Sequence, residues 1–245
     1  MIELYNSIFK RKSIRKFDDT LVLTEAELAQ IKQETEKLTP LVNDIKVKFE
    51  IVERAKTTAK RGEYCLIIYS ENKTNYLLNA GYLLEQMDLF LASHDIGVCW
   101  YGLAKLKEPQ AGELDYVIML AFGKSRPQDF RKCASDFKRK STEVIWSGEF
   151  DSDVVDAVRL APSACNTQPW RIVSEGTQIK VYRNTKIKSF IPASKLPFYN
   201  SIDTGISLCF LEIALSHKGY EFDRELITEG KINSGLLEIA NYNIK

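Results

Sequence analysis

The chain has 245 residues, a formal net charge of +1, and hydrophobic and charged fractions of 44% and 27%. A chain of this length and composition buries a sizeable core, as one large domain or two closely packed halves, and is not expected to be disordered. Its near neutrality excludes a global electrostatic field for nucleic acid, a membrane surface or an acidic substrate, so any anion site must be local.

The cysteines point to a reducing compartment. Five of them, Cys65, Cys99, Cys133, Cys165 and Cys209, are scattered along the chain without a Cys-x-x-Cys pair. This pattern suggests neither a disulfide framework nor a metal cluster. The amino terminus does not resemble a signal peptide, and no apolar run is long enough to cross a bilayer. We therefore expect a cytoplasmic protein without a metal site, a membrane partner or a nucleic-acid partner.

In chain order, the first part of the sequence alternates helices with short apolar strands. Thr24 and Glu27 have the capping-box spacing that begins a helix, which must stop before Pro40. Gly97 is a natural exit from a long apolar helix. The predicted elements are helices over 3–10, 24–39 and 75–94, strands over 49–52, 65–69, 98–101 and 116–122, and a basic surface loop over 126–140.

The second part repeats this order. Asp151 or Ser152 caps a helix, and a loop over 162–169 leads to a strand over 170–174. Gly176 turns the chain into a hairpin partner over 179–182. An apolar helix over 202–218 and strands over 220–224 and 236–242 complete the chain.

The two long helices share a pattern that predicts an internal repeat. Gly81 and Gly205 sit near their starts, Leu84 matches Leu208, and Asp88 matches Glu212. The elements before each helix also follow the same order. The alternative is chance likeness between two amphipathic helices. We interpret the chain as two pseudo-repeat halves, residues 1–150 and 151–245.

Two separated segments carry the strongest functional signal. Residues 161–172 read Ala-Pro-Ser-Ala-Cys-Asn-Thr-Gln-Pro-Trp-Arg-Ile, in which small residues let the backbone approach a flat ligand and two amides offer polar contacts. Taken alone, this segment could be an ordinary helix-to-strand turn. Residues 11–17 read Arg-Lys-Ser-Ile-Arg-Lys-Phe and concentrate positive charge in a chain that is nearly neutral overall.

Together these segments resemble the flavin-dependent nitroreductase family, in its internally duplicated form. Members open with Arg-x-Ser-x-Arg and carry an Ala-Pro-Ser-x-x-Asn-x-Gln-Pro-Trp loop. Ile96-Gly97-Val98-Cys99-Trp100, and Leu120-Ala121-Phe122-Gly123 followed by Lys138-Arg139-Lys140, are similar to two further family segments. The resemblance implies an α+β nitroreductase-like fold with a central, mainly antiparallel sheet and flanking helices. It also implies that the two halves of one chain imitate the family dimer, with one flavin site retained.

The resemblance implies a site for flavin mononucleotide (FMN), with NADH or NADPH as transient hydride donor. Arg11 would lie near the phosphate and Arg15 near the ribityl chain or the pyrimidine edge. Backbone N–H groups around Gly97 would face the reactive ring nitrogen. The implied cofactor-binding residues are Arg11, Lys12, Ser13, Arg15, Ile96, Gly97, Val98, Lys138, Arg139, Pro162, Ser163, Ala164, Asn166 and Gln168. Of these, Gln168 is also expected to brace its loop, as Trp170 is.

The implied activity is reduction of an electron-poor acceptor, such as a nitroaromatic or a quinone, by a ping-pong mechanism. The flavin carries the chemistry, so no side-chain acid or base is expected. The expected partner is a small-molecule acceptor, and the expected state is a monomer acting as a pseudo-dimer. Two alternatives remain: a flavin carrier or sensor with little turnover, and a family member with other flavin chemistry, such as dehalogenation or dehydrogenation.

Overall fold

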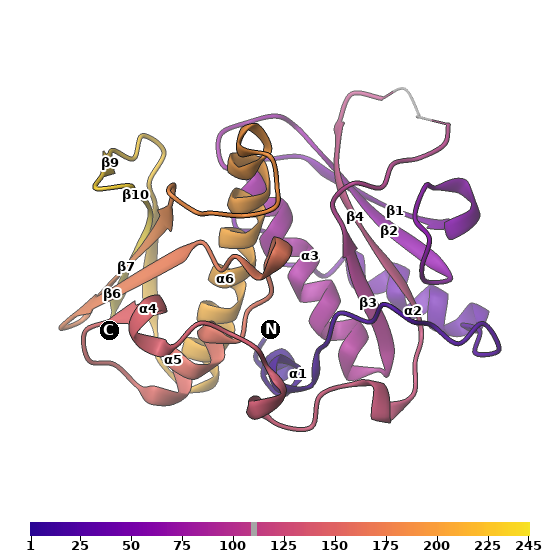
Figure 1. Cartoon of the computed structure of the whole chain (residues 1–245), viewed down its shortest axis with the longest axis horizontal. Coiled ribbons are helices and arrows are strands. Elements are labelled where there is room, and N and C mark those ends of the chain that lie inside the picture. Colours follow the sequence, from indigo (N-terminus) through magenta and orange to yellow (C-terminus); the bar gives the residue numbers. More distant parts are fainter. Residues whose placement is uncertain (109–111) are drawn as a thin grey trace.

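A computed structural model describes residues 1–108 and 112–245, and Figure 1 shows two sheets separated by paired helices. The helices are α1 (Tyr5–Lys10), α2 (Glu25–Thr35), α3 (Tyr76–Ser93), α4 (Thr142–Ile145), α5 (Ser152–Arg159) and α6 (Leu196–His217). The strands are β1 (Val47–Glu53), β2 (Tyr64–Ser70), β3 (Ile96–Tyr101), β4 (Asp115–Lys124), β5 (Trp146–Ser147), β6 (Trp170–Glu175), β7 (Gln178–Asn184), β8 (Phe222–Leu226), β9 (Ile232–Asn233) and β10 (Leu236–Ile244).

The chain forms two sheets, one within residues 47–124 and one within residues 146–244, so the second sheet begins with β5 just before the predicted boundary at residue 150. The first sheet has the order β1-β2-β4-β3 and is antiparallel throughout. The second has the order β5-β6-β7-β10-β8, with β9 paired to β10, and only the short β5–β6 pair is parallel. The α+β class and the antiparallel strands are therefore confirmed.

The predicted single central sheet with flanking helices is wrong. Helices α3 and α6 lie at the centre and pack against each other, with one sheet on either side (Figure 1). The physical reason is their composition. From Leu78 to Ala92, every residue of α3 is buried, and so is every residue of α6 from Ile202 to Leu215. Helices that are apolar on nearly all sides must lie inside the molecule.

Two glycines allow this close crossing. A Cβ atom on Gly81 would lie 2.1 Å from the Ile202 carbonyl oxygen, and one on Gly205 would lie 2.0 Å from the Leu78 carbonyl oxygen. Only glycine leaves room for backbone at this separation. The two contacts are reciprocal, as expected if the halves are related by pseudo-twofold symmetry.

Most predicted boundaries agree with the structure, and the capping box at Thr24 is confirmed because both of its hydrogen bonds to Glu27 form. The main difference is α6, which begins at Leu196, six residues before the predicted start at Ile202. Pro197 sits in its first turn, where proline's missing N–H has no cost. Among the described residues, no helix has the length and apolarity needed to cross a membrane.

Candidate functional site

A mainly apolar cavity with converging polar groups lies where the two halves meet. It has a volume of about 570 Å³, which suits a small organic ligand. The first half contributes Ser13, Arg15, Arg61, Cys99, Trp100, Gly102, Leu103 and Ile118. The second half contributes Pro162, Ser163, Ala164, Cys165, Phe190, Ile191, Pro192, Lys195, Tyr199, Ile202, Asp203 and Ile206. We call it the central cavity.

The amino-terminal segment reaches this cavity by pairing with β3. The Ile14 N–H donates to the Val98 carbonyl at 2.8 Å, and Ser13 forms a parallel bridge with Val98. This pairing buries Ile14 and leaves Ser13 and Arg15 on the cavity wall. The structure thus brings together two of the segments that the sequence singled out.

Gly97 has a packing role in this arrangement. A Cβ atom at this position would lie 2.3 Å from the Ser125 hydroxyl and 2.8 Å from the Ile14 side chain. Glycine therefore lets the amino-terminal segment lie close against β3. Ile96, Gly97 and Val98 are all buried, and none of them lines the central cavity.

Arg11 is buried beneath the site. Its side chain is 1% exposed, with Nη2 2.9 Å from Asp88 Oδ2 and Nε 3.8 Å from Glu85 Oε1. Burial, together with the neighbouring Asp88, raises the pKa of Glu85 well above its usual range. The Arg11 charge is therefore matched mainly by Asp88, which also accepts a bond from Trp100 Nε1 at 2.9 Å. In this conformation the Arg11 side chain forms a buried ion pair in the protein interior and does not line the central cavity.

The loop over residues 162–169, which we call the proline-containing loop, has an unusual backbone conformation and several stabilising hydrogen bonds. Cys165, Asn166 and Gln168 all have positive φ angles, between 44° and 55°. Gln168 is fully buried: its N–H donates to the Ser163 hydroxyl at 2.8 Å, and its Oε1 accepts from the Lys140 N–H at 2.8 Å. These bonds fix the left-handed turn that presents Pro162, Ser163 and Ala164 to the cavity.

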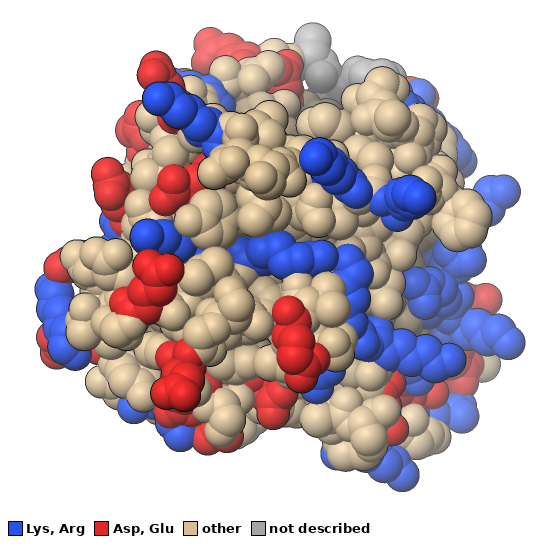
Figure 2. All heavy atoms as spheres, turned by 60° about the vertical axis from the view of Figure 1, so that its left-hand side comes forward, with Lys and Arg blue, Asp and Glu red and all other residues tan. Residues whose placement is uncertain are grey.

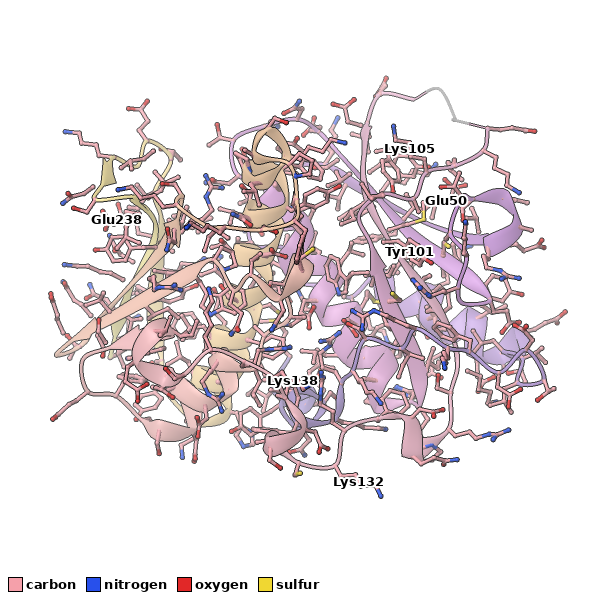
Figure 3. All side chains as sticks on the ribbon, viewed as in Figure 1. Glu50, Tyr101, Lys105, Lys132, Lys138 and Glu238 are labelled. Carbon is pink, nitrogen blue, oxygen red and sulfur yellow. The ribbon has the colours of Figure 1, made fainter. Side chains whose placement is uncertain are left out.

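Residues 126–140, which we call the basic tail, contact both the amino-terminal segment and the proline-containing loop. Lys12 Nζ donates to the Asp129 carbonyl, and Arg131 donates to the Arg11 carbonyl. Arg139 donates to the Leu160 carbonyl and to Asn166 Oδ1 at 3.0 Å. Residues 126–140 therefore bridge the amino-terminal segment and the proline-containing loop. Lys138 is exposed at the base of the molecule, between the halves (Figure 3).

The tail arginines carry positive charge that is poorly matched. Burial, and repulsion from Arg11, lower the pKa of Arg131 to about 10. The same two causes, together with Arg131, lower the pKa of Arg139 to about 9. Such shifts mean that the folded protein disfavours this charge unless an anion is nearby.

The predicted site residues therefore fall into two groups. Those that line the central cavity are Ser13, Arg15, Pro162, Ser163 and Ala164. Those that lie around or beneath it are Arg11, Lys12, Ile96, Gly97, Val98, Lys138, Arg139, Asn166 and Gln168. All belong to segments that the structure brings together between the halves.

The structure adds cavity residues that the sequence did not indicate. Asp203 lies inside α6, its Oδ1 accepts from the Ala164 N–H at 2.9 Å, and burial raises its pKa to about 8. The sequence signal that could have indicated Asp203 is an acidic residue inside an otherwise apolar helix. Phe190 is fully exposed at the mouth, and the Tyr199 hydroxyl donates to the Gly102 carbonyl across the halves. Phe190 and Tyr199 lie outside the sequence motifs described above.

Among the described residues, the cysteines and histidines form no functional cluster. All five cysteines are free thiols. Within the described ranges, no group of three or more His, Cys, Asp or Glu side chains is placed to hold a metal ion. His217 stacks on Tyr5 at 3.7 Å between ring centroids, and His94 contacts Phe90, so both pack locally.

Comparisons with known proteins identify the family. A family model described as "Putative TM nitroreductase" matches residues 3–215. The crystal structure of a "putative nitroreductase" from Thermotoga maritima shares 18% identity with a TM-score of 0.65, covering 98% of this chain and 92% of that one. A nitroreductase family protein from Clostridium novyi shares 19% identity over 53% of this chain and 88% of that one, with a TM-score of 0.41. No curated protein matches. Because the family model spans most of both halves, the chain belongs to this nitroreductase family.

Proposed function

We propose that the protein is an FMN-dependent oxidoreductase that takes reducing equivalents from NADH or NADPH and passes them to an electron-poor acceptor. The observation that carries this proposal is the central cavity, where Arg15 and Ser13 from one half face the Pro162–Ala164 loop from the other. Membership of a nitroreductase family supports an oxidoreductase.

The residues present fit a flavin. The cavity walls combine apolar surfaces from Trp100, Ile118 and Ile206 with few polar groups, as a flat aromatic ring requires. Arg15 supplies a cation on one wall. Burial and repulsion from Arg11 lower the pKa values of Arg131 and Arg139 in the basic tail, so an anionic cofactor bound nearby would stabilise their charge.

The chain's own residues bind and orient, and the bound flavin supplies the redox chemistry. The hydrogen-bonded left-handed loop presents Ser163 and Ala164 to the cavity, which Ser13 lines from the other half. Arg15 would stabilise negative charge at the edge of a reduced ring. The exposed Phe190 ring offers a stacking surface at the mouth for an incoming planar reactant.

We further propose one flavin site per chain. A second cleft lies near the start of α3, lined among others by Asn75, Leu78, Ser201 and Ile239. No residue of the first half's own loop, 39–45, lines this cleft. The cleft therefore lacks a counterpart of the loop that walls the central cavity, so it is expected to bind no flavin.

The decisive experiment is spectroscopic. The purified protein, loaded with FMN, is mixed anaerobically with NADH and then with NADPH while absorbance of the oxidised flavin is followed. We expect one of the two to bleach the flavin within seconds, and a nitroaromatic or quinone to restore the colour. Mass analysis of the cofactor released from the protein as purified, before FMN is added, checks that it is FMN.

The carrier alternative gives a different result in the same experiment. A flavin carrier or sensor would bind FMN with little or no bleaching by either dinucleotide. The absence of any flavin binding at saturating FMN would contradict both functions. Bleaching followed by dehalogenation or dehydrogenation of a test substrate, without nitro or quinone reduction, would indicate different flavin chemistry.

A further inference from the structure

A second hollow lies on the other side of the proline-containing loop, and its walls are strongly basic. Lys140 from the tail, Arg171 from β6, and Lys186 and Lys188 from the segment after β7 all line it. Its lining contains no aspartate or glutamate among the described residues. Four cations without an acid are a marked local excess in a chain of net charge +1. We call this hollow the basic pocket.

Two of these cations are bonded only to neutral backbone oxygens among the described residues. Lys140 Nζ donates to the Thr167 carbonyl at 2.5 Å and Arg171 Nη1 to the Trp170 carbonyl at 2.5 Å, and both donate to the Gln168 carbonyl at 3.3 Å. Burial lowers the pKa of both side chains, and repulsion from Arg171 lowers that of Lys140 further. Neither forms an ion pair with a carboxylate in the part of the chain that the structure describes. A bound anion would offset this repulsion.

The segment that carries the two exposed lysines is anchored at its start. The Lys186 N–H donates to Asn184 Oδ1 at 2.8 Å, and the Thr185 N–H donates to the Gly235 carbonyl at 2.8 Å. These bonds anchor the start of the segment, so Lys186 and Lys188 are presented beside the two half-buried cations. A band of Lys and Arg side chains crosses the middle of one face of the molecule (Figure 2).

The basic pocket adjoins the central cavity, because Cys165 and Phe190 line both. The shared wall places the four basic side chains next to the space that a planar ligand would occupy. We propose that the basic pocket binds the phosphate group of a molecule whose planar part occupies the central cavity. Lys and Arg at close range are the side chains that recognise phosphate. The proposal rests on charge and geometry and requires no turnover.

The test uses the flavin-free, full-length protein and pyrophosphate as the probe, with calorimetry at constant ionic strength. The pocket variant is Lys186→Gln with Lys188→Gln, since both side chains are exposed. The matched control is Lys180→Gln with Lys245→Gln, which removes the same charge from lysines paired elsewhere with Glu175 and Asp223. We expect saturable binding by the wild type and the control, and at least tenfold weaker binding by the pocket variant.

The proposal is overturned if pyrophosphate does not bind the wild type, or if both variants bind it equally well. This measurement needs no flavin, so its failure is distinct from failure of the proposed function. Two further arms identify the source of the phosphate. A pocket variant that loses affinity for FMN but not for riboflavin indicates the flavin's own phosphate. One that binds FMN normally but has a raised KM for NADH or NADPH indicates the donor's phosphate. If neither changes, no phosphate-bearing ligand of the central cavity uses the pocket, and the proposal fails.

Discussion

At the scale of single residues, Arg11 has a structural role that its motif does not indicate: it pairs with buried carboxyl groups. The Arg11→Met variant leaves the Asp88 and Glu85 carboxyl groups buried without their cation. Removing one partner of such a buried pair costs about 3–5 kcal/mol of folding free energy. Chemical denaturation checks this. The control, Lys10→Gln, breaks the half-exposed pair with Asp95 and is expected to cost under about 1 kcal/mol. Equal losses in the two variants would contradict the assigned role.

Asp203 gives a prediction on pH. Burial raises its folded-state pKa to about 8 from an ordinary value of 3.8. The unfolded chain therefore loses this proton near pH 4, whereas the folded protein keeps it until about pH 8. The wild type loses stability as pH rises through this window, relative to Asp203→Asn, at up to about 1.4 kcal/mol per pH unit. Denaturation curves at several pH values test this, and a difference that stays constant with pH would disprove it. Asparagine is a suitable replacement, because Asn79 in the first half holds a loop in the same way. Its Oδ1 accepts a hydrogen bond from the Leu41 N–H.

At the scale of elements, the α3–α6 crossing depends on Gly81 and Gly205. Alanine favours a helix by about 1 kcal/mol over glycine, but here its Cβ would clash with backbone of the other helix. We expect Gly81→Ala and Gly205→Ala each to lower stability by about 1–3 kcal/mol, by similar amounts because their contacts are reciprocal. Thermal unfolding measures this. Gly112→Ala, where nothing lies within 4 Å of the added Cβ and φ lies outside the left-handed region, is the control and should change little. Stabilisation by either alanine would refute the close crossing.

The sequence predicted individual elements well and their arrangement less well. Periodicity and capping identified the long helices and most strands, because those signals are local. The shorter elements β5, β9 and α4 were missed, since two to four residues carry too little pattern. The placement of two helices between two sheets depends on long-range burial. The same holds for the site: motifs located Ser13, Arg15 and the proline-containing loop, whereas Phe190 and Tyr199 reach the cavity only through the tertiary fold.

At the scale of the whole molecule, corresponding positions recur in the two halves. Asn79, Gly81 and Asp88 precede Asp203, Gly205 and Glu212 by the same 124 residues. Asn79 and Asp203 each accept a hydrogen bond from a loop N–H, and Gly81 and Gly205 allow the helices to cross closely. Asp88 pairs with Arg11, and Glu212 pairs with Arg224. These correspondences support an internal duplication, which remains a proposal. They also indicate how two similar halves of one chain could enclose a site between them.

The central claim is that a single chain closes one FMN site between its halves. Titration of the flavin-free protein with FMN, combined with sedimentation analysis, tests it most directly. We predict saturation at one FMN per 28.0 kDa chain, with the protein remaining monomeric. Arg15→Gln should weaken binding, because it removes a cavity cation without disturbing the buried Arg11 pair. Saturation at two FMN per chain, or binding that appears only in a dimer, would contradict the account.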